Sequence, residues 1–231
     1  MAGLFLTFEG LDGSGKSTHL GRVARWLSAH ERACRVTHEP GGTALGDAIR
    51  RAFLEAEPGP ADGRVELLLV FASRRQHLLE VIEPALAAGE VVLCDRFTDS
   101  TVAYQGHGRG VAADEIARLD ALATGGRRPD RTLLFDLPAE EARRRGDSHE
   151  RRRRGRANRI DREELAFYER VREGYLALAA GEPERFRVID SSGPREATEA
   201  RVRAALADLF PALAAEAGGE LAAAAGVAAP G

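Results

Sequence analysis

Short apolar runs recur along this chain and alternate with longer segments in which apolar residues return at helical spacing. Short runs bounded by turn residues predict buried strands, and a period near 3.6 predicts amphipathic helices. We predict strands at residues 4–8, 34–37, 91–94, 132–137 and 186–189, and helices at residues 17–29, 65–88, 114–122, 164–180 and 196–210, with two more around Arg50 and from residue 139. Because strands and helices alternate, we expect an α/β fold in three layers: a five-stranded parallel sheet with helices on both faces.

The helix expected at residues 65–88 is long and carries Arg74 and Arg75 in its middle. We expect it to bury the apolar side chains of Leu68, Leu69, Ala72 and Leu79. Residues 107–110 contain two glycines and two basic residues and indicate a flexible loop. The pattern describes one domain over residues 1–210, whereas residues 211–231 are rich in Ala and Gly, lack periodicity and are expected to form a flexible tail.

Composition narrows the class of protein. The formal net charge of −3 gives no reason to expect a nucleic-acid or membrane partner. The chain has no apolar run of about 18 residues and begins with a strand rather than with a charged leader and cleavage site. We therefore expect a cytoplasmic protein. Cys34 and Cys94 lie in separate strands without metal-ligand spacing, so two reduced thiols are expected.

The first predicted strand leads into a stretch that fits G-x-x-x-x-G-K-[ST] and precedes a helix. Such a P-loop directs backbone N–H groups and the positive end of a helix dipole toward nucleotide phosphates. We therefore expect ATP and Mg²⁺, with Lys16 reaching the β- and γ-phosphates and Ser17 ligating the metal ion. The residues expected to bind the nucleotide are Gly10, Leu11, Asp12, Gly13, Ser14, Gly15, Lys16, Ser17 and Thr18.

Lys16 is the only lysine among the 33 lysines and arginines of the chain. All the other members of this group are arginines. A planar guanidinium cannot replace a compact ammonium group inside a tight phosphate cradle. The single lysine therefore stands where phosphate binding requires one.

Asp95 and Arg96 directly follow the predicted strand at residues 91–94. In an open α/β sheet the carboxyl ends of the strands border the ligand crevice. An acid and an arginine at this edge are placed for a metal ion and a phosphate. A surface ion pair is the alternative, but the P-loop lies at the same edge.

Residues 143–162 contain ten arginines and almost no large apolar residue. The segment could be a solvated charged loop, a nucleic-acid-binding arm, or a lid that neutralises phosphate charge and excludes water during phosphoryl transfer. Its position between the last helices of a P-loop domain favours the lid.

Four motifs follow one another along the chain: the P-loop, Glu39-Pro40-Gly41-Gly42-Thr43, Asp95-Arg96, and Ala103-Tyr104-Gln105-Gly106 with Arg109-Gly110. In these motifs and their order the chain resembles bacterial thymidylate kinases over residues 4–210. The resemblance implies a homodimeric nucleoside monophosphate kinase that transfers the γ-phosphate of ATP to dTMP, giving dTDP for dTTP synthesis. The alternatives are another nucleoside monophosphate or deoxynucleoside kinase, and a non-catalytic nucleotide-dependent regulator that binds nucleic acid through its arginines.

The resemblance also implies roles for substrate-binding residues. Asp12 would approach the 3′-hydroxyl of dTMP, and Arg50 and Arg96 would hold its phosphate. Arg74 would hydrogen-bond to the thymine edge, and Tyr104 would lie under the deoxyribose and exclude a 2′-hydroxyl. The other residues implied to line this pocket are Glu39, Val70, Ser100 and Gln105, although Ser100 could instead cap a helix.

The chain resembles the family type whose transition-state arginine lies in the lid, because its P-loop offers Gly13 and Ser14 rather than a cation. The catalytic residues implied are Lys16, Asp95, Arg96, Arg154, Arg156 and Arg159, with Mg²⁺ held by Ser17 and Asp95.

Two positions depart from the family pattern. Val70 stands where the family usually has a phenylalanine that stacks on thymine. Phe71 is adjacent, but successive helix residues point about 100° apart, so Phe71 cannot simply take the place of that ring. Either Val70 packs on the base with a weaker contact, or the helix is shifted. His38 stands where many relatives have arginine, which weakens the expected attraction for phosphate.

Overall fold

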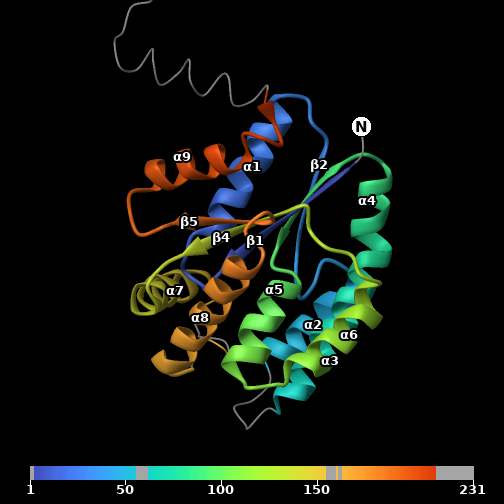
Figure 1. The fold of residues 1–231 in the computed structure, drawn as a ribbon, viewed down its shortest axis with the longest axis vertical. Coiled ribbons are helices and arrows are strands. Elements are labelled where there is room, and N and C mark those ends of the chain that lie inside the picture. The colour runs from blue at the N-terminus through green and yellow to red at the C-terminus, as the bar shows by residue number, and fades with distance from the viewer. Residues whose placement is uncertain (1–2, 56–61, 155–159, 161–162, 212–231) are drawn as a thin grey trace, which may run out of the picture.

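A five-stranded sheet forms the centre of the computed structural model, which describes residues 3–55, 62–154, 160 and 163–211 (Figure 1). All neighbouring strands are parallel, in the order β2-β3-β1-β4-β5. The strands are β1 (Leu4–Gly10), β2 (Cys34–His38), β3 (Val91–Asp95), β4 (Arg131–Asp136) and β5 (Phe186–Asp190). The predicted parallel sheet is confirmed, with each strand close to its predicted bounds.

Helices lie on both faces of this sheet, which gives the three predicted layers (Figure 1). One face is covered by α1 (Lys16–Ala29) and α9 (Arg195–Leu206). The other side holds α2 (Ala44–Glu55), α3 (Gly63–His77), η1 (Leu78–Ile82), α4 (Glu83–Ala87), α5 (Thr98–Thr101), η2 (Val102–Gly108), α6 (Ala113–Thr124) and α8 (Leu165–Gly181). Over the described residues, no helix has the length and apolar character needed to cross a membrane.

The side chains of β1 point alternately into the helical layers on the two faces of the sheet. Leu6 and Phe8 pack in the cluster that includes α1 and α9, whereas Phe5 packs with Leu78 and Ile82 on the other face. Because successive strand residues point to opposite faces, Glu9 shares the face of Phe5. A carboxylate is thereby directed into the interior at the carboxyl end of the central strand.

The structure corrects the expected burial of the helix at residues 65–88. The segment is helical through α3, η1 and α4, but Leu68 is 57% exposed, Leu79 is 52% exposed and Ala72 is exposed, while Arg74 is buried. The helix is apolar on two sides, and the side that carries Leu67, Val70 and Phe71 faces the interior. Periodicity alone did not distinguish the two sides.

The predicted flexible loop at residues 107–110 is also corrected, because residues up to Gly108 belong to the π-helical segment η2. Close packing against α8 explains the order of this segment. A Cβ atom at Gly174 would lie 2.6 Å from the ring of His107, so glycine allows the two elements to touch. The Arg109 side chain is held by Glu66 and lies over the ring of Phe167.

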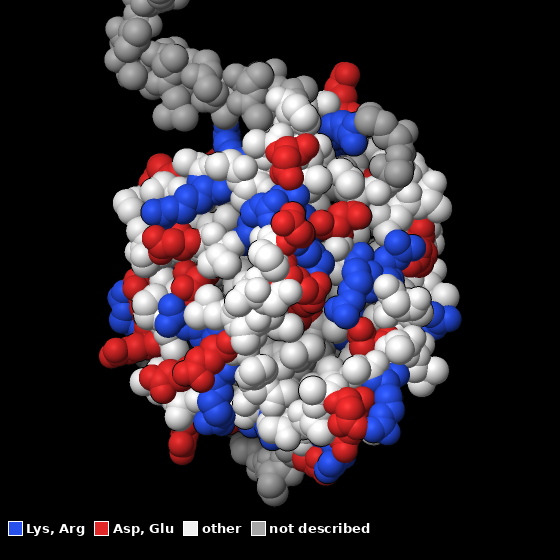
Figure 2. All heavy atoms as spheres, viewed as in Figure 1, with Lys and Arg blue, Asp and Glu red and all other residues white. Residues whose placement is uncertain are grey.

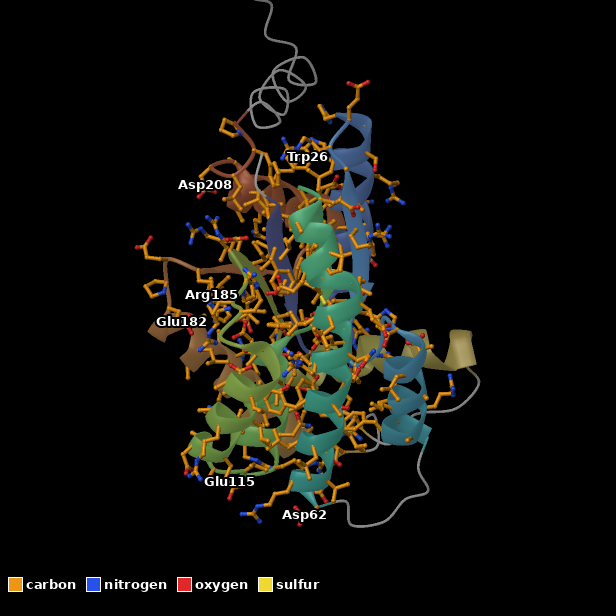
Figure 3. All side chains as sticks on the ribbon, turned by 90° about the vertical axis from the view of Figure 1, so that its right-hand side faces the viewer. Trp26, Asp62, Glu115, Glu182, Arg185 and Asp208 are labelled. Atoms are coloured by element: carbon orange, nitrogen blue, oxygen red, sulfur yellow. The ribbon has the colours of Figure 1, made fainter. Side chains whose placement is uncertain are left out.

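A buried ion pair ties α5 to the segment before β5. Arg185 donates to both carboxylate oxygens of Asp99, at 2.7 and 2.9 Å, and the two side chains are almost fully buried. Arg185 also pairs with Glu182, and Figure 3 shows these two side chains next to each other.

We expect Arg185→Met to lower the free energy of unfolding by about 3–5 kcal/mol, because it leaves the charge of Asp99 buried without its partner. The matched control is Arg35→Met, which breaks the exposed pair with Glu90 and should cost at most about 1 kcal/mol. Urea denaturation of the variants measures both losses. Equal losses would contradict the assignment of Arg185 to a buried pair.

Candidate active site

A cavity of about 760 Å³ opens at the carboxyl edge of the sheet, next to the P-loop. Fifteen of the residues proposed from sequence line it, namely Asp12, Gly13, Gly15, Lys16, Ser17, Thr18, Glu39, Arg50, Val70, Arg74, Asp95, Arg96, Ser100, Tyr104 and Gln105. Gly10, Leu11 and Ser14 do not line it and belong to the buried base of the loop. Arg154 ends the backbone of α7 (Ala139–Arg154), whereas Arg156 and Arg159 lie outside the described residues.

The P-loop connects β1 to α1, which begins at Lys16. Gly13 has a φ of +86°, a conformation that side-chain-bearing residues rarely adopt. A Cβ atom there would also lie 2.2 Å from the carbonyl oxygen of Ala142 in α7. Glycine at this position therefore permits both the turn of the loop and the close approach of α7.

Lys16 and Arg96 both contact the carboxylate of Asp12. Lys16 Nζ lies 3.0 Å and Arg96 Nη2 lies 2.8 Å from Asp12 Oδ1. Burial alone would raise the pKa of Asp12, but the charges of Lys16 and Arg96 outweigh it and hold this pKa far below its usual range. Asp12 is therefore ionised and draws the two cations together at the centre of the cavity.

Ser17 and Asp95 form the proposed metal site. The Ser17 hydroxyl donates to Asp95 Oδ2, and Asp95 Oδ1 is buried without a hydrogen-bond partner among the described residues. A hydroxyl beside a carboxylate with spare acceptor capacity is an all-oxygen donor set, which Mg²⁺ prefers. The residues present therefore fit the expected ion.

Arg96 is the centre of a hydrogen-bond network. Its Nη1 donates to Ser100 Oγ at 3.0 Å and to the Tyr175 hydroxyl at 2.9 Å. Its Nη2 bonds to Tyr104 at 3.2 Å in addition to Asp12, and its guanidinium lies 4.9 Å from the centre of the Tyr104 ring. Both terminal nitrogens are therefore fixed in direction before any substrate is present.

Arg74 is buried and held by a second network. Its Nε donates to Glu39 Oε2 at 2.7 Å, and its Nη2 donates to Thr101 Oγ1 at 3.0 Å. The other oxygen of Glu39 contacts His77 Nδ1 at 2.9 Å. Arg74 Nη1 is buried without a hydrogen-bond partner among the described residues. One nitrogen of a side chain that lines the cavity is therefore left without an acceptor in the part of the chain that the structure describes, and is available to a ligand.

Val70, not Phe71, faces the cavity. Phe71 packs with Leu67 and Ile116 in the cluster between α3 and α6, and the guanidinium of Arg74 lies over its ring. The helix is thus not shifted to bring Phe71 to the cavity. The apolar wall beside Val70 is completed by Phe53 and Leu54 of α2.

Two further positions of the sequence proposal are placed by polar contacts. Gln105 Nε2 donates to the buried Glu66, which also accepts from Arg109. Arg50 Nη1 donates to the Pro40 carbonyl. Burial and the charge of Arg50 lower the pKa of His38, against the effect of Asp47. His38 is therefore neutral at neutral pH and adds no positive charge to the cavity.

Sequence reasoning missed four side chains that shape this site: Glu9, His77, Arg145 and Tyr175. Arg145 lines the cavity and donates to the Ser191 carbonyl in the turn after β5. Within a run of ten arginines, nothing in the sequence marked it. Glu9 could have been found, since strand alternation points it away from Leu6 and Phe8 into the interior, where a carboxylate needs partners.

A family model described as thymidylate kinase matches residues 8–202. A thymidylate kinase of Desulfovibrio desulfuricans is 48% identical over 207 residues, which are 88% of this chain and 94% of the relative. One of Geobacter sulfurreducens is 49% identical over 210 residues, covering 90% of this chain and 99% of the relative.

A solved structure of thymidylate kinase from Ehrlichia chaffeensis superposes with a TM-score of 0.66 at 34% identity, over 82% of this chain and 93% of that one. Sequence and fold therefore agree over most of the chain. The chain belongs to the thymidylate kinase family, which transfers the γ-phosphate of ATP to dTMP to give dTDP.

Proposed function

We propose that the cavity holds ATP and dTMP head to head and that its side chains align them for in-line phosphoryl transfer. The observation that carries this proposal is that the P-loop and a cluster of three arginines, Arg50, Arg74 and Arg96, line one cavity. The acceptor is a phosphate that is already anionic at neutral pH. Positioning and charge neutralisation therefore suffice, without a strong general base.

The donor end is the P-loop. Lys16 would bind the β- and γ-phosphates, and in doing so it would exchange its contact with Asp12 for one with a phosphate oxygen. Ser17 and Asp95 would hold Mg²⁺, which neutralises charge on the ATP phosphates when bound. Arg145 lies between the P-loop side of the cavity and the turn after β5, where it can contribute positive charge on the ATP side.

The acceptor end is built around Arg96. Arg96 and Arg50 would bind the dTMP phosphate, and Asp12 would accept a hydrogen bond from the 3′-hydroxyl. Tyr104 would pack on the deoxyribose and leave no room for a 2′-hydroxyl. The lid arginines proposed for the transition state are Arg154, Arg156 and Arg159.

The base would lie between the apolar wall and Arg74. Arg74 Nη1 offers a hydrogen bond to a carbonyl oxygen of thymine, and its direction is fixed by Glu39 and Thr101. Val70 would contact the ring with less area than an aromatic side chain. Ser100 and Gln105 border the same region, with their polar groups held by Glu9 and Glu66.

The test is a coupled assay of ADP release with dTMP, dUMP, UMP and dCMP as acceptors. We expect the largest kcat/KM for dTMP, and Lys16→Ala should lower kcat by at least about 100-fold, because it removes charge stabilisation from the transferred phosphate. The exposed variant Arg35→Met serves as the control and should retain activity. An enzyme that prefers UMP or dCMP over dTMP would sink the assignment of the acceptor pocket.

For the base contact, we expect Arg74→Lys to raise the KM for dTMP about tenfold, because a compact ammonium keeps a positive charge near Glu39 but cannot span the separate positions of Glu39, Thr101 and the base as a planar guanidinium does. Arg75→Lys is the matched control, since Arg75 is the next residue on α3 and lies outside the cavity. Steady-state kinetics on both variants measure the two values of KM for dTMP. A KM for dTMP that responds equally to both changes would exclude a specific role for Arg74.

We propose that a second copy of the chain covers the exposed apolar side of α3. Val65, Leu68, Ala72 and Leu79 are exposed at spacings of three, four and seven residues, which places them on one side of the helical segment. Leu45 on α2 and Leu122 on α6 are exposed on the flanking helices, and Figure 3 shows α2, α3 and α6 together on one face. Such a stripe is typical of a surface that pairs with another helix.

Light scattering coupled to size exclusion tests this surface. We expect the unmodified chain to have the mass of a dimer and Leu68→Glu to shift it to a monomer at micromolar concentration, because a buried unpaired charge opposes association. Val188→Glu changes an equally exposed aliphatic residue on β5 and should leave the dimer intact. Dissociation by both changes, or by neither, would place the interface elsewhere.

We further propose that the enzyme works in the cytoplasm without a nucleic-acid partner, since both of its substrates are free nucleotides. On the face shown in Figure 2, acidic and basic side chains are interspersed, and the described residues form no continuous basic surface there. Retention on single-stranded or duplex nucleic acid at physiological salt would contradict this proposal.

A further inference from the structure

Glu9 is a fully buried carboxylate at the end of β1, and its three hydrogen-bond donors all lie around the acceptor end of the cavity. Its Oε1 accepts from the Phe97 amide at 2.7 Å, and its Oε2 accepts from Ser100 Oγ at 2.5 Å and from the Tyr175 hydroxyl at 3.0 Å. Glu9 does not line the cavity. Any effect on substrate must therefore pass through its partners.

The same two hydroxyls accept hydrogen bonds from Arg96. Each hydroxyl has one hydrogen, and each receives one N–H from Arg96 Nη1. The two hydroxyls also lie 2.7 Å from each other, and Ser100 is the nearer of the two to Glu9, at 2.5 Å against 3.0 Å. The Ser100 hydrogen therefore goes to Glu9, and the Tyr175 hydrogen is shared between Glu9 and Ser100. The result is a connected relay in which the cation donates to two hydroxyls and the hydroxyls donate toward the carboxylate. Charged ends make such hydrogen bonds strong and directional.

From this geometry, and building on the function proposed above, we propose that Glu9 is a positioning residue for phosphate binding. Through Ser100 and Tyr175, its carboxylate holds Nη1 of Arg96, so that the guanidinium keeps the orientation in which it receives the phosphate of dTMP. Ser100 thus belongs to the support of Arg96, and its hydroxyl is not available to the base.

The direction of this relay depends on Glu9 being ionised. Burial raises the pKa of Glu9 to about 7, and the charge of Asp99 adds to the rise, while Arg96 and the hydrogen bonds from Ser100 and Phe97 oppose it. Below this pKa the protonated carboxyl accepts fewer hydrogen bonds, and one hydroxyl must turn elsewhere. The other titratable groups around it are Tyr175 of α8, Tyr104 of η2, Cys94 of β3, and Arg185, which pairs with Asp99.

The first test compares two ligands that differ only at the phosphate. We expect Glu9→Gln to weaken binding of dTMP about tenfold in calorimetry, because one charge-assisted anchor of Arg96 is lost, and to leave binding of thymidine unchanged. The control is Thr7→Val, which removes the buried contact with Thr132 from the same strand and should bind both ligands normally. Equal weakening of both ligands, or no weakening, would overturn the proposal.

The second test uses pH. As pH rises through about 7, the ratio of kcat/KM for dTMP between the unmodified enzyme and Glu9→Gln should increase, because only the unmodified enzyme gains an ionised Glu9. The phosphate of dTMP titrates in both assays, near pH ~6, and cancels in the ratio. A ratio that is independent of pH would overturn the role of the ionised carboxylate.

Tyr175→Phe keeps the test decisive if Glu9→Gln does not fold. It removes one relay hydroxyl while Glu9 remains, and we expect the same selective loss for dTMP over thymidine. In the double variant the losses should be less than additive, since both changes break one relay. If the unmodified enzyme itself fails to bind or phosphorylate dTMP, the proposed function fails, whereas normal dTMP kinetics in these variants refute only the role of Glu9.

Discussion

The charge of Arg96 is the constraint on which the carboxyl edge of the sheet depends. A guanidinium with little solvent contact must be compensated, and this one has Asp12 on one side and the hydroxyls before Glu9 on the other. These groups come from the P-loop, α5, α8 and the end of β1. Arg96 therefore connects the donor loop, the acceptor pocket and the central strand. A change in the orientation of any one of these groups would alter the contacts that Arg96 makes with the others.

The base pocket follows the same principle with a different anchor. Arg74 donates hydrogen bonds to Glu39 and Thr101, and His77 contacts the other carboxylate oxygen of Glu39. Nε and Nη2 of the arginine bond to Glu39 and Thr101, and Nη1 is left for a ligand. In both networks a buried acid, rather than the ligand, sets the direction of the arginine. Preorganisation of this kind reduces the entropy that substrate binding would otherwise have to overcome.

The sequence was sufficient for the parallel sheet and for most of the residues around the cavity, because strand ends and glycine motifs carry their own geometry. It was insufficient where the burial of a side chain depends on which element packs against its side of a helix. Leu68 and Leu79 looked like core residues, since the apolar pattern of α3 and η1 does not say which side meets the sheet. Glu9 and His77 were missed because their roles arise from contacts with residues far away in the chain. Arg145 could not be separated from its arginine neighbours, since only the packing of α7 on the P-loop brings it to the cavity.

The contact of Gly13 with α7 limits where evolution can place a catalytic cation in this enzyme. Its left-handed backbone and the carbonyl of Ala142 leave no volume for a side chain at position 13. An arginine at this point of the loop would require α7 to withdraw, and with it Arg145 and its hold on the turn after β5. A single substitution at position 13 therefore cannot add a cation to the P-loop without a movement of α7.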